Sequence, residues 1–254
     1  MSVLSRALLL LALPCWPIAP LAAEVERWQG YAYDLDTQAL VYSETHERRY
    51  ESGQLLAGKD TYLDPEGALI AEKELRFEHP TAPIFTLDDQ RIQYREGLKR
   101  EAAGWVTFKM EPGSGKLQEA PVTLEGEPVA DAGFDRYILQ EWNALLAGER
   151  RTFDFIVPSQ LRAIRFRVEK VGEENRQGRA LVHMELKPDG FLLRNLVSPI
   201  QLYYDRDTRQ LAEYQGISNV RKLNGKGYKV RIEFPAKEFT RTAAATPCEQ
   251  EPCS

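Results

Sequence analysis

The sequence has little of what marks the common kinds of catalytic or metal site. Its 254 residues include only three histidines and three cysteines. Cys248 and Cys253 have no histidine near them, so they cannot form a four-ligand zinc site. No phosphate-binding glycine loop, dinucleotide fingerprint, Gly-x-Ser-x-Gly or His-Glu-x-x-His motif occurs. We therefore expect no metal, no cofactor and no enzymatic activity.

An excess of positive charge is also missing. The chain has 33 Lys and Arg against 38 Asp and Glu, for a formal net charge of −5. Proteins that bind nucleic acid neutralise phosphates with clustered cations. Nucleic acid is therefore not an expected partner, and no long block of like charge indicates an acidic or basic tail.

A long apolar run occurs only near the N-terminus. Met1–Arg6 carries one positive charge, Leu8–Ala19 is almost wholly apolar, and small residues precede the first acid, Glu24. This order is typical of a secretory signal peptide, and the run is shorter than the about 20 residues that span a bilayer. We predict that residues 1–23 are a signal peptide cleaved after Ala23, which gives a soluble periplasmic protein.

The C-terminal segment differs in composition from the rest of the chain. Beyond Pro235 it turns to Thr, Ala and Pro, and we expect residues 241–254 to form a loose tail. In an oxidising compartment, the even cysteine count favours a disulfide between Cys248 and Cys253 that closes a small loop. Two free thiols are the alternative.

Strand periodicity dominates the body of the chain. Apolar and polar residues alternate in Leu69–Glu78, Arg162–Lys170, Ala180–Lys187 and Tyr228–Phe234, with Lys73 intruding on an apolar face. Turn sequences such as Asn-Gly and Pro-Asp-Gly separate these runs at intervals of about ten residues. This spacing indicates an antiparallel sheet rather than a parallel α/β sheet.

One segment has helical periodicity instead. Asp131–Ala147 places large apolar side chains at helical spacing; Asp131 can cap its start, and Gly148 can end it in the left-handed conformation. A single aromatic-rich helix among many strands needs a concave apolar face to bury against. The predicted fold class is mainly β: one curled antiparallel sheet, a half-barrel, wrapping one central α-helix in a single domain over residues 24–240.

Two regions carry a family resemblance. They are Ser198–Asp205 with the following Thr208–Leu211 and Tyr214–Asn219, and Trp142–Gly148 leading into Phe153-Asp154-Phe155. Together they resemble an uncharacterised family of bacterial periplasmic proteins, a domain of unknown function. That family resembles the half-barrel of the lipoprotein carriers LolA and LolB. The resemblance implies an incomplete antiparallel barrel that leaves an apolar cavity beside a helix, and no catalytic residues.

These patterns lead to one preferred function and one alternative. The preferred function is a non-enzymatic periplasmic binding protein that holds a lipid or another apolar ligand between sheet and helix. The alternative is an envelope structural or interaction protein with a filled core, which would bind another envelope protein. In both cases we expect a monomer. The residues expected to contact the ligand are Phe134, Ile138, Trp142, Leu145, Phe155 and Phe166.

Two polar groups leave other interpretations open. Glu44 and His46 lie on one face of a probable strand and are the one candidate acid/base or metal-ligand pair; a solvated strand face is the ordinary explanation. A local basic patch is the second group. It could bind anionic lipid headgroups, or it could be the ordinary solvent-exposed face of a strand. It consists of Arg150, Arg151, Arg162, Arg165 and Arg167.

Overall fold

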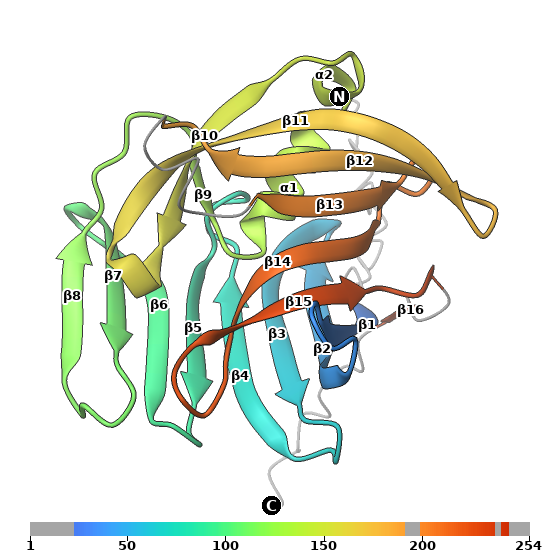
Figure 1. Cartoon of the computed structure of the whole chain (residues 1–254). Helices are drawn as coiled ribbons and strands as arrows, with labels where there is room; N and C mark the ends of the chain where they lie inside the picture. Colours follow the sequence, from blue (N-terminus) through green and yellow to red (C-terminus); the bar gives the residue numbers. More distant parts are fainter. Residues whose placement is uncertain (1–22, 191–198, 237–239, 244–254) are drawn as a thin grey trace, which may run out of the picture.

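The chain folds around one large β-sheet. The structure, a computed structural model, describes residues 23–190, 199–236 and 240–243 (Figure 1). The helices are α1 (Gly133–Gln140), α2 (Trp142–Leu146) and the short 3-10 helix η1 (Pro158–Gln160). The strands are β1 (Glu24–Asp34), β2 (Leu40–Glu51), β3 (Gln54–Leu63), β4 (Leu69–Arg76), β5 (Ile84–Asp89), β6 (Tyr94–Glu101), β7 (Gly104–Met110), β8 (Leu117–Pro121), β9 (Pro128–Ala130), β10 (Arg151–Val157), β11 (Arg162–Arg176), β12 (Arg179–Pro188), β13 (Ile200–Asp205), β14 (Leu211–Arg221), β15 (Gly227–Glu233) and β16 (Thr240–Ala243).

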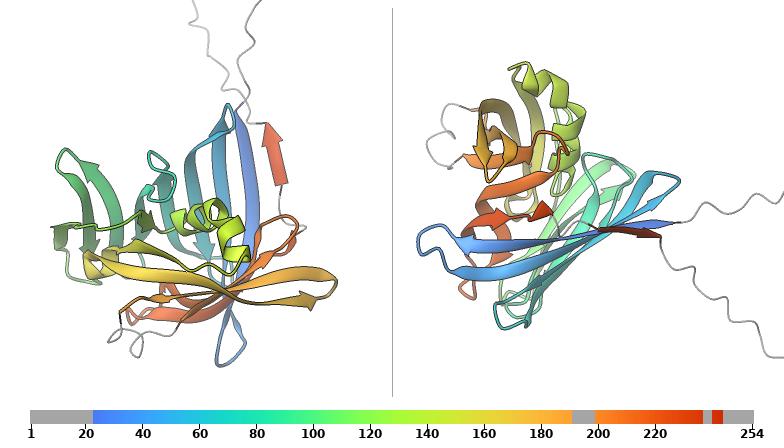
Figure 2. Two further views of the ribbon diagram at one scale, coloured as in Figure 1. Left: turned by 90° about the horizontal axis from the view of Figure 1, so that it is seen from above. Right: turned by 90° about the vertical axis from the view of Figure 1, so that its right-hand side faces the viewer.

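The strand order explains why the sheet curls. It runs β8-β7-β6-β5-β4-β3-β2-β1-β15-β14-β13-β12-β11-β10-β9, so β8 and β9 lie at opposite ends although they are consecutive in the chain. Residues 122–127 join them, and such a link spans at most about 25 Å. The two ends of the sheet must therefore approach each other, and Figure 2 shows the resulting curl from two sides.

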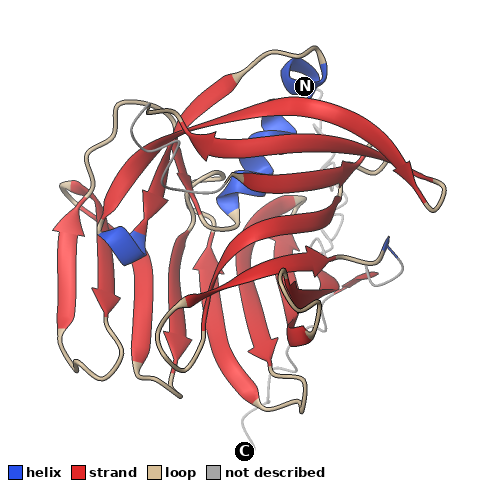
Figure 3. Cartoon of the chain, in the orientation of Figure 1, coloured by secondary structure: helices blue, strands red, loops and turns tan. Residues whose placement is uncertain are grey.

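Side chains from both ends of the strand order meet in the interior. Trp105 of β7 and Ile156 of β10 belong to one buried apolar cluster, and Lys109 Nζ donates to the carbonyl of Ser159 at 2.9 Å. Except for the parallel β9–β10 pair, neighbouring strands are antiparallel. The predicted fold class, a curled antiparallel sheet wrapping a helical segment, is confirmed, and Figure 3 shows how few residues are helical.

The predicted helix is correct in position and wrong in detail. It is two short helices with a break at Glu141, which has φ −91° and ψ 7°. Asp131 does not cap α1, because its side chain binds other partners and its own φ is +43°. Gly148 does end α2 as predicted: its φ is +85°, and its N–H donates to Leu145 O at 3.0 Å.

A glycine lets α1 begin close to the sheet. A Cβ on Gly133 would overlap the carbonyl oxygen of Thr81, in the connection between β4 and β5. The neighbouring Ala130 N–H donates to that same oxygen at 2.9 Å. The start of α1 is therefore fixed against the inside of the β4–β5 region.

Several sequence predictions concern residues outside the described ranges. These are the signal peptide, apart from Ala23, and the pair Cys248 and Cys253. At the C-terminal end, β16 pairs with β1 in antiparallel fashion, so strand pairing extends into the first three residues of the predicted tail. No helix in the described ranges is both long enough and apolar enough to cross a membrane.

Candidate functional site

The six residues predicted to contact an apolar ligand meet in one layer between the helices and the sheet. Ile138, Trp142, Leu145 and Phe166 are buried in it, and Phe134 and Phe155 are partly buried at its border. They come from α1, α2, β10 and β11. We call these six residues with their apolar neighbours the apolar layer; the neighbours include Phe153, Val168, Met184, Leu202 and Tyr204.

The protein's own side chains fill much of the apolar layer. The Phe155 and Phe166 ring centroids lie 5.5 Å apart, and those of Trp142 and Tyr204 lie 5.8 Å apart. These are the separations of aromatic rings packed in a core. The structure thus brings the six predicted residues together, and whether they bind a ligand stays a prediction.

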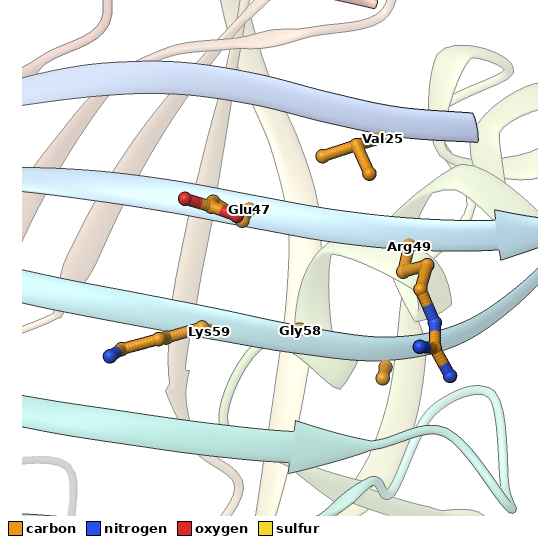
Figure 4. Close-up of a pocket in the computed structure, with 6 residues that line it drawn as sticks. Val25, Glu47, Arg49, Gly58 and Lys59 are labelled. Atoms are coloured by element: carbon orange, nitrogen blue, oxygen red, sulfur yellow. The ribbon is translucent and has the colours of Figure 1, made fainter. Parts of the chain in front are cut away.

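Two surface hollows lie away from the apolar layer. The larger, about 280 Å³, is on the outer face of β1–β3 (Figure 4) and is lined by Val25, Glu47, Arg49, Ala57, Gly58 and Lys59. The smaller, about 190 Å³, is lined by Leu69, Ile70, Ala71, Glu72, Asp88, Gln90 and Arg91. None of the six predicted residues lines either hollow.

Few polar contacts hold the helices on the sheet. Tyr204 on β13 donates a hydrogen bond to Asp135 Oδ1 on α1 at 2.9 Å, and Tyr137 donates to Thr152 O at 3.3 Å. Burial raises the pKa of Asp135, because its carboxylate loses part of its solvation at this position. The helices are therefore attached mainly by the apolar layer.

Replacing Tyr204 by phenylalanine should lower the free energy of unfolding by about 1 to 3 kcal/mol. The change removes the Asp135 partner and leaves the ring packing intact. Urea unfolding measures the loss. Tyr203→Phe is the control on the same strand, because no hydrogen bond from its hydroxyl to α1 is seen in the described structure. An equal loss in both variants would contradict the role given to the Tyr204 hydroxyl.

A second cluster on the inner face of the sheet is polar. It consists of Glu44, His46 and Arg48 on β2, Asp60 on β3, Lys73 on β4, and Asp131 just before α1. The first five are between 1% and 9% exposed, and the Asp131 side chain is 8% exposed. We call these six residues the charge network. It holds three basic and three acidic side chains, so their charges can balance inside the fold.

His46 and Asp60 are at the centre of the charge network. His46 Nδ1 lies 2.8 Å from Asp60 Oδ1, and His46 Nε2 lies 2.9 Å from Glu44 Oε1. Arg48 Nη1 donates to the same Asp60 oxygen at 2.6 Å. The Trp28 ring stacks on the His46 imidazole at 5.0 Å between centroids, which shields this end of the network.

Lys73 links the sheet to the start of α1. Its Nζ lies 3.2 Å from Asp60 Oδ2 and 2.7 Å from Asp131 Oδ1, and Asn219 Nδ2 donates to the other Asp131 oxygen at 3.1 Å. Asp131 is thus engaged by β4 and β14, which explains why it does not cap α1. Its strained backbone is compensated by these contacts.

The carboxylates determine the protonation state of His46. Burial alone would lower the pKa of His46, but Asp60 and Glu44 outweigh it and raise that pKa to about 9. Burial alone would raise the pKa of Asp60, but Arg48, His46 and Lys73 hold it well below its usual range. Near neutral pH, His46 is an imidazolium with both N–H groups donating, so it is not poised as a general base.

The sequence-based explanation of Glu44 and His46 as a solvated strand face is wrong. The curl of the sheet turns that face of β2 inward, and Tyr42, Glu44, His46 and Arg48 are all buried. Asp60 and Asn219 were not identified from the sequence. Asp131 was predicted only as a helix cap, and Lys73 was seen only as an intruder on an apolar face. In the described residues, no three His, Cys, Asp or Glu side chains form a group that could hold a metal ion.

Most of the basic patch is paired with acids. Arg150 lies 2.9 Å from Glu169, and Arg165 lies 3.1 Å from Asp154. Arg151 pairs with Glu141 and Glu149, and Arg167 lies near Glu169 and Asp189. The arginines thus mainly pair with acids of this chain, and the patch is not a free cationic surface.

Comparison with known proteins finds similarity only among solved structures. No family model matches the chain, and no curated protein matches it. A β-barrel-like protein of a domain of unknown function (DUF1849) from Brucella abortus has 7% identity and TM-score 0.40, covering 89% of this chain and 99% of its own.

Two further matches are named as a lipoprotein-sorting protein domain and as a LolA superfamily protein. A putative outer membrane lipoprotein-sorting protein domain from Vibrio parahaemolyticus has 7% identity and TM-score 0.33, with 89% and 88% coverage of the two chains. A LolA superfamily protein from Nitrosomonas europaea has 7% identity and TM-score 0.21, with 90% and 89% coverage. As the sequence resemblance predicted, the matching structures include an uncharacterised β-barrel-like protein and a LolA superfamily protein. The fold class itself rests on the strand order of this chain.

Proposed function

We propose that this chain is a non-enzymatic binding protein of the bacterial periplasm. It holds an apolar ligand, such as the acyl chain of a lipid, in the apolar layer. The supporting observation is that six apolar residues from two helices and two strands converge there, with Phe134 and Phe155 only partly buried at the border. The signal-peptide pattern of residues 1–23 supports export.

The helices are the part of the fold most easily displaced by a ligand. α1 has 8 residues and α2 has 5, and helices this short are not stable without packing. Apart from the Tyr204–Asp135 and Tyr137–Thr152 hydrogen bonds, they pack mainly through apolar side chains, and an acyl chain offers the same kind of contact. Entry of a chain under α1 would therefore exchange one apolar contact for another, and the Tyr204–Asp135 hydrogen bond is the main polar contact that it would have to break or shift.

The experiment uses Trp142 as the reporter. The chain from Glu24 onward contains three tryptophans, and the double variant Trp28→Phe/Trp105→Phe leaves Trp142 alone. A brominated fatty acid quenches tryptophan only on close contact, so we expect saturable quenching in this variant. Unchanged Trp142 emission up to the solubility limit of the acid would contradict the proposal.

A matched variant tests the place of binding. Trp28→Phe/Trp142→Phe leaves Trp105, which is buried in a different cluster near η1. Its emission should stay nearly constant over the same titration. Equal quenching in both variants would indicate binding without a defined site, which also contradicts the proposal.

The filled core favours a second candidate, an envelope interaction protein. The rings of the apolar layer already pack on each other, and the edge strand β8 pairs only with β7 within the described sheet. An exposed edge can accept a strand from another protein. A photo-crosslinker at Gln118 on β8 should then trap one reproducible partner in the native host, and absence of any such partner would remove this candidate.

A further inference from the structure

The β14–β15 hairpin differs in charge from the rest of the chain. Residues 214–232 contain five Lys and Arg and no Asp or Glu, in a chain whose net charge is −5. The tight turn at its end is closed by Gly225, whose N–H donates to Lys222 O at 2.8 Å. This hairpin therefore presents a local positive charge on an acidic protein.

Three of the five cations have partners within the fold. Arg221 donates to the Tyr94 hydroxyl at 2.6 Å, Lys222 lies 3.6 Å from Asp34, and Arg231 pairs with Glu233. Lys226 and Lys229 are exposed and form no ion pair with any described residue. These two lysines are available to an external anion.

The turn also exposes an apolar side chain. Leu223 is 73% exposed, more than any other large apolar residue in the described structure. It stands next to Lys222 and three residues before Lys226. Exposing a leucine on a turn beside lysines has no benefit for folding, because the side chain contacts little of the protein.

The β7–β8 turn lies against this hairpin and also combines an exposed lysine with an exposed leucine. A Cβ on Gly225 would be 3.3 Å from Pro112 Cγ, so the two turns are in contact. Lys116 is exposed without an ion pair to the described residues, and Leu117 is 49% exposed. Both turns point toward the bottom of Figure 1. We call Lys116, Leu117, Leu223 and Lys226 the cationic tip.

Most acids near the cationic tip are already paired. Glu111 lies 2.6 Å from Lys109, and Asp34 faces Lys222. Asp36, on the adjacent β1–β2 turn, is exposed and forms no ion pair with a described residue. The tip therefore keeps a net positive charge towards the solvent.

We propose that the cationic tip docks this protein on the surface of a bilayer that contains anionic phospholipid. The leucines enter the boundary between headgroups and acyl chains, and Lys116 and Lys226 contact lipid phosphates. A folded protein partner would need a larger contiguous apolar area than two single leucines, one on the β14–β15 turn and one at the start of β8. The tip lies outside the apolar layer, so this docking is independent of the proposed ligand binding.

Vesicle co-sedimentation tests the proposal. The chain from Glu24 onward contains every described strand and lacks the predicted signal peptide. We expect it to sediment with phosphatidylglycerol/phosphatidylcholine vesicles at low ionic strength, less at high salt, and not with phosphatidylcholine alone. Lys226→Gln and Leu223→Ser should each lower the partition coefficient roughly fivefold, the equivalent of about 1 kcal/mol.

Leu69→Ser is the matched control. Leu69, the first residue of β4, is 50% exposed, but Glu66 and Glu72 are near it in the sequence. Its replacement should leave vesicle binding unchanged. The proposal is overturned if anionic vesicles do not bind the protein, if phosphatidylcholine binds it equally, or if the tip variants bind like the wild type. That last result would assign the free lysines to an acidic protein partner.

Discussion

Replacing Asp60 by asparagine is expected to lower the free energy of unfolding by about 3 to 5 kcal/mol. Asp60 is 1% exposed and lies within 3.2 Å of His46, Arg48 and Lys73. The amide keeps the shape and loses the charge, so three buried cations are left with too few anions. Because a domain has only about 5 to 15 kcal/mol of stability, this single change approaches the threshold of unfolding.

Urea unfolding of the wild type and the variant measures this effect. Glu72→Gln is the matched control, since Glu72 is a carboxylate on the adjacent strand that pairs with Lys59 at 2.6 Å but is 44% exposed. An exposed pair contributes at most about 1 kcal/mol. A comparable, small loss in both variants would show that the charge network does not stabilise the fold.

The second large effect is a loss of stability at alkaline pH. The pKa of His46 rises from 6.5 to about 9 in the folded protein. A raised folded-state pKa means that the folded protein holds the proton more tightly, so this stabilisation is complete below pH 6.5 and is lost as the pH rises through about 9. The pKa difference corresponds to about 3 kcal/mol.

The measurement compares the wild type with His46→Gln across this pH window. The glutamine can still hydrogen-bond to a carboxylate, but it cannot be charged. We expect the difference in free energy of unfolding between the two proteins to shrink from pH 6.5 to pH 9. A constant difference, or an imidazole that titrates near its ordinary value in an NMR experiment, would contradict the assignment of His46 as a buried imidazolium.

The apolar layer was predictable, whereas the charge network was not. Phe134, Ile138, Trp142 and Leu145 repeat at helical spacing, so their common face could be seen in one short segment. On β2, both faces carry polar residues, and alternation alone cannot show which face is buried. Lys73 was the one visible signal, as a lysine on the apolar face of a strand.

The network depends on strand register and on a contact far away in the chain. His46 pairs with Asp60 across β2–β3, and Asp60 pairs with Lys73 across β3–β4, so the three residues form one row across the sheet. Asp131 joins Lys73 from 58 residues further along the chain. No local sequence pattern encodes the strand register or the Lys73–Asp131 contact. Because that contact could not be seen in the sequence, Asp131 was predicted to be a helix cap.

The amino-acid sequence alone determined that the chain forms antiparallel strands with one short helical segment, because alternation, turn residues and helical spacing act between near neighbours. Only the tertiary structure decided which strand face is buried, which charges neutralise each other and which leucines remain in water. The curl of the sheet and the strand register set those outcomes, since they bring together groups that are far apart in the sequence.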